Sequence, residues 1–283
     1  MKPYIKEMRP KNWVKNIFVF IPLVFSLELF NAEKLLMTII AFAAFCLASS
    51  AVYVFNDIID ADKDAAHPVK HSRPIASGLI TTRKAAIFVA VLAGTGIVIS
   101  LAANLLTGML VAGYLTLNVV YTLRLKHKPI LDCFCIATGF VLRIYAGGAA
   151  SGEVVSDWLF LTIVAMSLFM AFGKRRGELL RVRTCETREV LNSYDLSFLK
   201  GIVFACAGLS IVFYSLWAMY RGSNMIYTVP LIIFIVAKYL LLIHSRDSHG
   251  DPTTVIFEDK SLFAACGLYG LLMIVLLYFG EKV

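Results

Sequence analysis

The chain reads Asn56-Asp57-Ile58-Ile59-Asp60-Ala61-Asp62-Lys63-Asp64 directly after an apolar run that extends from Leu35 to Phe55. A run of about 20 apolar residues is long enough to cross a bilayer as a helix. Four carboxylates then follow closely, at the place where this helix would leave the lipid. The stretch therefore predicts a membrane-spanning helix with a strongly acidic aqueous end.

The spacing of this acidic end is typical of a metal site. On a continuing helix, Asn56, Asp60 and Asp64 share one face, and Asp57 lies at its edge. Carboxylates packed this closely repel each other unless a cation lies among them. Oxygen ligands favour Mg²⁺, which proteins often share between one or two carboxylates and a substrate phosphate. The alternative is a solvated helix end, but basic residues are the usual anchors at a cytoplasmic helix end.

Composition places the whole chain in the membrane. It is 59% hydrophobic and only 16% charged, as expected for several membrane spans and not for a soluble domain. We predict an all-α, polytopic membrane protein that forms one integral-membrane domain over residues 1–283, with Asn104 as a tight turn between two nearly fused segments. The nine predicted transmembrane helices are 17–30, 35–55, 85–103, 105–121, 131–150, 157–173, 198–219, 226–243 and 261–279.

The positive charges fall on alternate loops. Of the 27 Lys and Arg residues, 22 lie in five segments, which are 1–16, 57–84, 122–130, 174–200 and 244–260. Cytoplasmic loops carry such an excess, so we expect the N-terminus and the acidic motif in the cytoplasm and the C-terminus outside. The net charge of +8 then reflects topology and anionic substrates or lipids, and no nucleic acid is expected as a partner.

Basic residues follow the acidic motif closely. Lys70 and Arg73 lie within ten residues of it, and metal on one side with cations on the other is a common way to hold a diphosphate. Ordinary positive-inside charge is the alternative. Arg143 lies inside an apolar segment, where a charge is expensive and a functional candidate, although pairing with backbone carbonyls would also explain it. The cluster Lys174-Arg175-Arg176-Gly177-Glu178 either binds an anion or anchors a helix end.

These residues resemble the UbiA-type prenyltransferase superfamily, in which an Asn-Asp-x-x-Asp-x-x-x-Asp motif ends the second helix of a nine-helix bundle. Within it, the match is to the decaprenyl-phosphate phosphoribosyltransferase branch. The segments that carry the branch resemblance are Arg9-Pro10-Lys11-Asn12-Trp13-Val14-Lys15-Asn16, His67-Pro68-Val69-Lys70-His71-Ser72-Arg73-Pro74 and Lys174-Arg175-Arg176-Gly177-Glu178.

This chain differs from the superfamily pattern at one place, and that difference determines which substrates the resemblance implies. Members that prenylate aromatic acceptors carry a second Asp-x-x-x-Asp motif near the sixth helix, whereas Lys174, Arg175 and Arg176 stand there in this chain. One acidic and one cationic site suit two different anions. The resemblance implies that these are phosphoribosyl diphosphate, held with Mg²⁺, and a polyprenyl phosphate, held by cations, in a multi-pass protein of the bacterial cell membrane that makes cell-envelope sugar lipids.

The resemblance also implies residue roles. Asn56 and Asp60 would bind Mg²⁺ directly, with Asp57 and Asp64 binding it directly or through water, and the three aspartates would be catalytic. Tyr53 would contact the ribose or diphosphate, Arg73 would support Lys70, and Tyr121 would position Lys126. Lys174, with Arg175 nearby, would take the lipid phosphate. The donor phosphates would be held by Lys15, Lys70, Lys126 and Arg143.

Two other functions stay open at this stage. An aromatic or haem prenyltransferase that uses a prenyl diphosphate would share the first acidic motif, but the basic cluster at Lys174 counts against it. A transporter would usually show polar residues at mid-membrane, whereas the charges of this chain gather on one face and only Arg143 and Lys238 lie deep. The sequence leaves the lipid length and the oligomeric state open, a homo-oligomer included.

The charge asymmetry predicts a labelling pattern. A cysteine introduced near Val283 should react with a membrane-impermeant maleimide from outside the cell, and one introduced beside Lys70 should react only from the cytoplasmic side. Labelling of both positions from the cytoplasm would contradict the count of nine helices.

Overall fold

The computed structural model describes residues 2–67, 70–181, 189–222, 224–244, 255 and 258–279. Within these ranges it contains helices and connecting segments and no strand, which confirms the all-α class. The chain divides into two compact units, Met1–Leu125 with Leu142–Val155, and Lys126–Val141 with Ser156–Val283. Helix α7 (Leu131–Ser151) contributes to both. That the chain is a single domain therefore stays a prediction.

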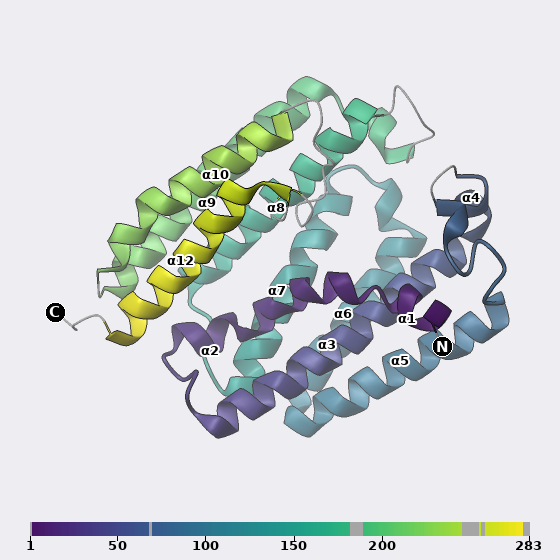
Figure 1. Ribbon diagram of the computed structural model, residues 1–283, viewed down its shortest axis with the longest axis horizontal. Helices are drawn as coiled ribbons and strands as arrows, with labels where there is room; N and C mark the ends of the chain where they lie inside the picture. The colour runs from purple at the N-terminus through teal and green to yellow at the C-terminus, as the bar shows by residue number, and fades with distance from the viewer. Residues whose placement is uncertain are drawn as a thin grey trace. The chain divides into compact units, whose positions relative to one another are not determined.

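The first unit is built around helix α3, against which α5, α6, η1 and α1 pack (Figure 1). Small residues, among them Ala41, Ala44 and Ala48, are fully buried along α3 and let the neighbouring helices approach closely. The elements of this unit in chain order are α1 (Lys2–Met8), the 3₁₀ helix η1 (Pro10–Phe20), α2 (Ile21–Phe25), α3 (Ala32–Ile59), α4 (Ala61–Ala65), the 3₁₀ turn η2 (Lys70–Ser72), α5 (Thr82–Ala103) and α6 (Leu105–Leu123).

Asn104 separates α5 from α6, as predicted. Its backbone is extended, and its side-chain oxygen accepts the N–H of Thr107 at 2.8 Å, an ordinary helix N-cap. Its amide nitrogen donates to the carbonyl of Ala149 at 2.7 Å. One residue therefore ends one span, begins the next and ties the turn to α7.

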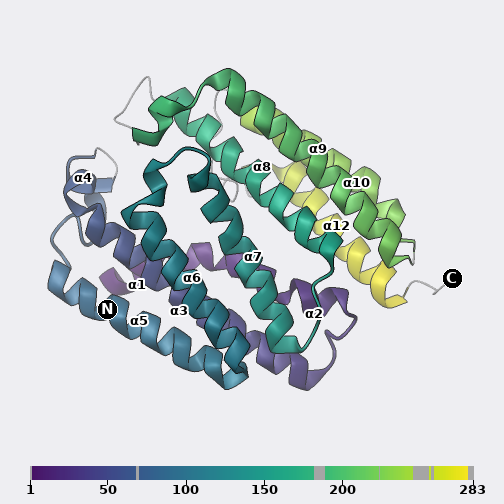
Figure 2. The same cartoon turned by 180° about the vertical axis from the view of Figure 1, so that it is seen from behind.

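In the second unit, α8 packs along α9, and α10 packs against α9 and α12 (Figure 2). The 3₁₀ turn η3 (Leu125–His127) contains the sequence boundary at which the first unit ends, at Leu125, and the second begins, at Lys126. The remaining elements are α8 (Asp157–Arg181), η4 (Glu189–Ser193), α9 (Leu196–Arg221), η5 (Met225–Thr228), α10 (Val229–His244) and α12 (Lys260–Phe279).

Eight helices in the described ranges are long and apolar enough to cross a membrane, so the predicted count of nine is not confirmed. Seven of the other predicted segments match these helices to within four residues at each end, whereas 157–173 stops seven residues before the end of its helix at Leu180. The first segment, 17–30, instead contains the end of η1, the short helix α2 and a turn with Leu27 in the left-handed region. Polar contacts hold η1 against α3, because Trp13 donates to Ser50 at 3.1 Å and the buried Asn16 donates to Ser49 at 3.2 Å.

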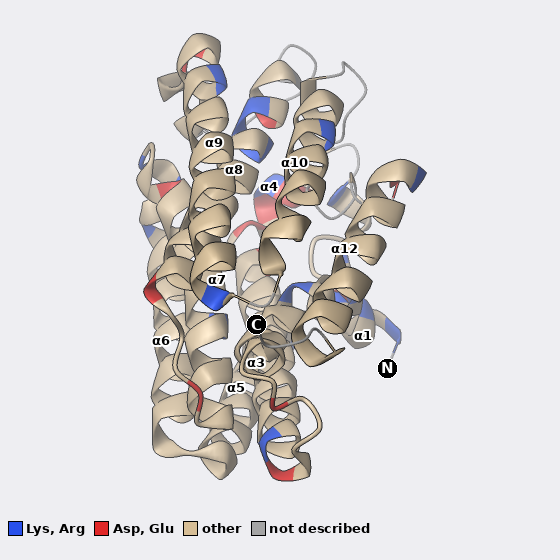
Figure 3. Cartoon of the chain, turned by 90° about the vertical axis from the view of Figure 1, so that its left-hand side faces the viewer, with Lys and Arg blue, Asp and Glu red and all other residues tan. Residues whose placement is uncertain are grey.

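Lys, Arg, Asp and Glu residues lie mostly at helix ends and in connecting segments, and the helix shafts contain few of them (Figure 3). Large apolar residues are exposed along the shafts instead. On α5, for example, Ile87, Val91 and Val98 are 57–68% exposed. An apolar exposed surface on long helices is what contact with lipid requires, and it identifies a multi-pass membrane protein.

The backbone of α7 lies close to η1 at Gly147. A Cβ atom there would lie 1.8 Å from the backbone oxygen of Val19, whereas one on Gly113 of α6 would meet nothing within 4 Å. We expect Gly147→Ala to cost about 1–3 kcal/mol through overpacking and Gly113→Ala to be neutral or slightly stabilising. Thermal unfolding in detergent measures both, and equal melting temperatures for the two variants would contradict the packing.

Candidate active site

The acidic motif lies at a break between two helices. α3 ends at Ile59, Asp60 has φ −95° and ψ 9°, and α4 begins at Ala61. The single continuous helix expected through Asp64 is therefore wrong, although the backbone of Asp64 still donates to Asp60 at 2.8 Å. The carboxylates that this arrangement buries are Asp57 and Asp64, each only 3% exposed, whereas Asp60 is half-buried.

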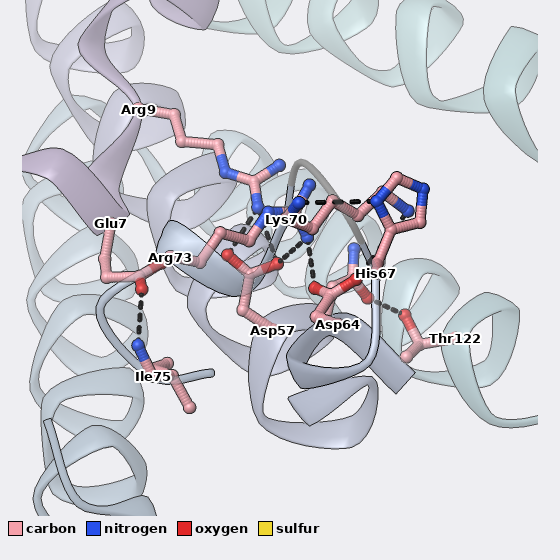
Figure 4. A network of polar contacts seen from close by, with 10 residues as sticks. Glu7, Arg9, Asp57, Asp64, His67, Lys70, Arg73, Ile75 and Thr122 are labelled. Atoms are coloured by element: carbon pink, nitrogen blue, oxygen red, sulfur yellow. Dashed lines mark hydrogen bonds and ion pairs between the residues drawn. The ribbon is translucent and has the colours of Figure 1, made fainter. Parts of the chain in front are cut away.

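Three cations of the chain neutralise these two buried carboxylates (Figure 4). Arg73 bridges them, because its Nη1 lies 2.9 Å from Asp57 and also binds Asp64. Arg9 contacts both oxygens of Asp57, and the Nζ of Lys70 lies 3.6 Å from Asp64. Buried carboxylates need such partners, so Arg73 does more than support Lys70.

Glu7 adds a third buried carboxyl group to this network. It is 2% exposed, and its Oε1 accepts the backbone N–H of Ile75 at 3.1 Å. Burial and the neighbouring Asp57 raise the pKa of Glu7 to about 7. Its carboxyl group therefore keeps its proton to a much higher pH than an exposed glutamate, which reduces repulsion from Asp57.

Asn56, another predicted magnesium ligand, is bound by a residue of α6. The hydroxyl of Thr122, at the end of α6, donates to Oδ1 of Asn56. In the part of the chain that the structure describes, no three His, Cys, Asp or Glu side chains form a group that could hold a metal ion. The expected gathering of four ligands on one face is therefore not seen, and the arginines lie against the carboxylates.

The donor chemistry nevertheless fits magnesium. Asn56, Asp57, Asp60 and Asp64 offer only oxygen ligands within about two helical turns, and Mg²⁺ binds one or two carboxylates together with substrate phosphates. Arg9, Arg73 and Lys70 are the cations that would then be available to those phosphates. The site therefore has the residue types of a metal–diphosphate site. In this structure its arginines and lysine form ion pairs with its carboxylates.

Arg143 lies deep in the first unit and is 6% exposed. Its Nε donates to Asn16 at 2.8 Å and its Nη2 donates to the hydroxyl of Tyr114 at 3.0 Å. The guanidinium also lies over the rings of Tyr114 and Phe45, 4.6 Å and 5.6 Å from their centroids. Cation–π contacts of this kind stabilise a desolvated charge and hold the guanidinium in one place.

Arg175 of the second unit forms ion pairs with carboxylates of the protein. It is 1% exposed and binds Asp132 through Nε, and its Nη1 lies 2.6 Å from Glu178. Tyr194 donates to the other oxygen of Asp132 at 2.7 Å, and burial raises the pKa of the Tyr194 hydroxyl well above its usual value. Such contacts are those of a residue that holds α7, α8 and the segment after η4 together, next to the half-buried Lys174.

The remaining predicted residues are distributed between the two units. Tyr53 lies under the guanidinium of Arg9, 5.2 Å from it, and therefore borders the acidic network. Tyr121 precedes Thr122 at the end of α6, Lys15 lies in η1, and Lys126 lies in η3 and belongs to the second unit.

Sequence reasoning missed the partners that come from distant segments. Glu7 and Arg9 lie about 50 residues or more from their partners, and Thr122 lies 66 residues from Asn56. No local spacing signals such contacts. The available hint was Arg9 itself, which opens the Arg-Pro-Lys segment of the branch resemblance.

Comparison with known proteins shows the family and the fold of this chain. Residues 17–267 match the UbiA prenyltransferase family, and the chain belongs to that family of membrane transferases. It superposes on a UbiA homologue from Archaeoglobus fulgidus bound to GPP and Mg²⁺ with a TM-score of 0.76 at 16% identity, over 99% of this chain and 100% of the other. This likeness shows the shared fold.

Two relatives are more similar in sequence. The chain is 35% identical to the decaprenyl-phosphate phosphoribosyltransferase of Mycolicibacterium smegmatis, over 91% of this chain and 87% of the relative. It is 34% identical to the protein of that name from Corynebacterium glutamicum, over 91% and 81% of the two chains.

The shared guanidinium of Arg73 should matter for stability. Arg73→Ala leaves Asp57 and Asp64 buried with one partner fewer, which we expect to cost about 1.5–3 kcal/mol. Lys70→Ala removes a more exposed and longer contact and should cost less than about 1 kcal/mol. Unfolding in detergent with EDTA measures both changes, and equal losses would show that Arg73 does not hold the carboxylates.

Proposed function

We propose that this protein transfers 5-phosphoribose from phosphoribosyl diphosphate to a long polyprenyl phosphate and releases pyrophosphate, with Mg²⁺ as its cofactor, in the synthesis of cell-envelope sugar lipids. The observation that carries this proposal is the charge of the two anion-binding candidates. One is the carboxylate–arginine network at Asp57 and Asp64. The other is the end of α8, where the acidic residue Glu178 is neutralised by Arg175.

The first site suits the sugar donor. Arginine binds phosphate oxygens in a bidentate manner, so Arg9 and Arg73 could turn from the carboxylates to a diphosphate, with Lys70 beside them. Bound magnesium, held by Asn56, Asp57, Asp60 and Asp64, would neutralise charge on the departing pyrophosphate. We assign the other donor phosphate contacts to Lys15, Lys126 and Arg143, and we assign Tyr53 to the ribose or diphosphate.

The second site suits the lipid. We assign the polyprenyl phosphate to Lys174, with Arg175 fixing the end of α8 through Asp132 and Glu178. Tyr121 would position Lys126. The chain would hold the lipid tail in the bilayer, where the exposed apolar helix surfaces lie.

The reaction does not need a strong general base. The lipid phosphate is already an anion, so its oxygen attacks the anomeric carbon without proton removal. The bond from that carbon to the diphosphate oxygen breaks, and the sugar acquires oxocarbenium character as in other glycosyl transfers. Attack on the face opposite to the leaving group inverts the anomeric carbon. The residues of the site therefore act by positioning the substrates and by balancing charge. Asp57, Asp60 and Asp64 would contribute to catalysis by holding the Mg²⁺ that neutralises the departing pyrophosphate.

A second candidate has one observation in its favour. A solved UbiA homologue with this fold is bound to GPP, a prenyl diphosphate, and Mg²⁺. Prenyl transfer from such a diphosphate needs no cationic site for a lipid phosphate, and the basic end of α8 therefore favours the sugar transfer.

The assignment predicts a split between the two substrates. Lys174→Ala should raise the apparent KM for polyprenyl phosphate roughly tenfold, and Lys70→Ala should do the same for phosphoribosyl diphosphate, because each loses a charge-assisted contact of about 1.5–3 kcal/mol. Initial rates measured with each substrate varied in turn give both constants.

Lys200→Ala is the matched control, since Lys200 is exposed near the start of α9 and should change neither KM. If Lys174→Ala and Lys70→Ala impair both substrates equally, the division into two sites is wrong.

A further inference from the structure

The short helix α1 lies against the segment that carries Lys70 and Arg73. Two consecutive side chains of α1 bind two backbone groups of that segment. Lys6 donates from Nζ to the carbonyl of Ser72 at 3.0 Å, and Glu7 accepts the N–H of Ile75 at 3.1 Å. The contacts bracket Arg73, so they fix the backbone on both sides of the residue that bridges Asp57 and Asp64.

The apolar face of α1 is anchored independently of these contacts. Tyr4 meets Phe88 of α5 edge-to-face at 5.1 Å. Tyr4 and Met8 also pack against a cluster that includes Val54, Ile75 and Ile80. The chain then turns at Arg9, whose backbone is left-handed with φ 50° and ψ 59°, and this turn places Arg9 on Asp57 (Figure 4). Such a conformation is uncommon outside glycine and persists where the surrounding structure holds it.

A simple structural role does not explain the carboxyl group of Glu7. The loop needs only a hydrogen-bond acceptor for the N–H of Ile75, which a neutral side chain could provide. Glu7 instead buries a carboxyl group beside Asp57, and burial of that group carries a desolvation cost. The side chain thereby links the backbone at Ile75 to the carboxylate that Arg9 and Arg73 bind. Its position connects the geometry of the loop with that of the charged network.

We propose that Glu7 is a positioning residue for the sugar donor, which through Ile75 sets where Lys70 and Arg73 meet the diphosphate. The inference rests on the proposed function for the identity of the donor. Glu7 does not touch the substrate, and its effect passes through the 70–75 segment. Its loss should therefore weaken the donor and leave the lipid phosphate, assigned to Lys174, unaffected.

The test compares Glu7→Ala with Glu7→Gln. The glutamine oxygen can still accept the Ile75 N–H, and its amide can donate to Asp57. We expect Glu7→Ala to raise the apparent KM for phosphoribosyl diphosphate about tenfold, with the KM for polyprenyl phosphate changed less than about twofold. Glu7→Gln should restore the donor KM to within about threefold of the wild type. Ile5→Ala, at a 53% exposed neighbour, is the matched control and should change neither constant.

A readout without substrate separates this proposal from the proposed function. Amide hydrogen exchange, followed by mass spectrometry of a peptide that contains Ile75, should be faster in Glu7→Ala and close to wild type in Glu7→Gln. Unchanged exchange in Glu7→Ala overturns the contact. Faster exchange with an unchanged donor KM overturns the positioning role alone. A wild type that transfers no phosphoribose overturns the proposed function and, with it, the donor assigned to Glu7.

If Glu7→Ala does not fold, Lys6→Ala carries the same test. It removes the exposed contact with Ser72, and we expect faster exchange over 72–75 and a donor KM raised about two- to threefold. No change in either measurement would overturn the role of α1.

Discussion

The site depends on the burial of two carboxylates, Asp57 and Asp64, at the end of a membrane-spanning helix. Buried carboxylates need charged partners, and the chain supplies Arg9 and Arg73. That requirement explains why η1 and α1 fold back along α3 and why the 70–75 segment returns to the motif. The neutralising cations are also the groups best suited to a diphosphate, so one network holds the fold and prepares the proposed substrate site.

The sequence was sufficient to predict the parts of the fold that follow from local pattern. Eight apolar runs predicted eight long helices, and Asn104 was correctly placed as the turn between α5 and α6, because both features depend on neighbouring residues only. The first apolar segment was expected to span as a helix. Its polar contacts through Trp13 and Asn16 and the close approach at Gly147 depend on distant elements, and periodicity carries no information about them.

The candidate site shows the same contrast between features set by neighbouring residues and features set by distant segments. The sequence indicated the residues around Asp57 and Lys70, but a helix that continues past Asp60 was expected, whereas α3 ends at Ile59 and α4 begins at Ala61. It also treated Arg175 as a ligand, whereas the structure gives Arg175 a buried pairing with Asp132 and Glu178. Charge counts along a chain show which sites are anionic or cationic, but the partners of each charge follow from the tertiary fold. The proposed lipid-phosphate role is therefore assigned mainly to Lys174.

We propose that the acidic network and the basic end of α8 serve two different anions, a sugar diphosphate and a lipid phosphate. Incubation of purified protein with labelled phosphoribosyl diphosphate, Mg²⁺ and polyprenyl phosphates of several lengths, followed by lipid extraction, tests it most directly. We expect label in the lipid fraction, pyrophosphate in equal amount and no product in excess EDTA. A lipid fraction without label, together with consumption of a prenyl diphosphate in the presence of an aromatic acceptor, would contradict it.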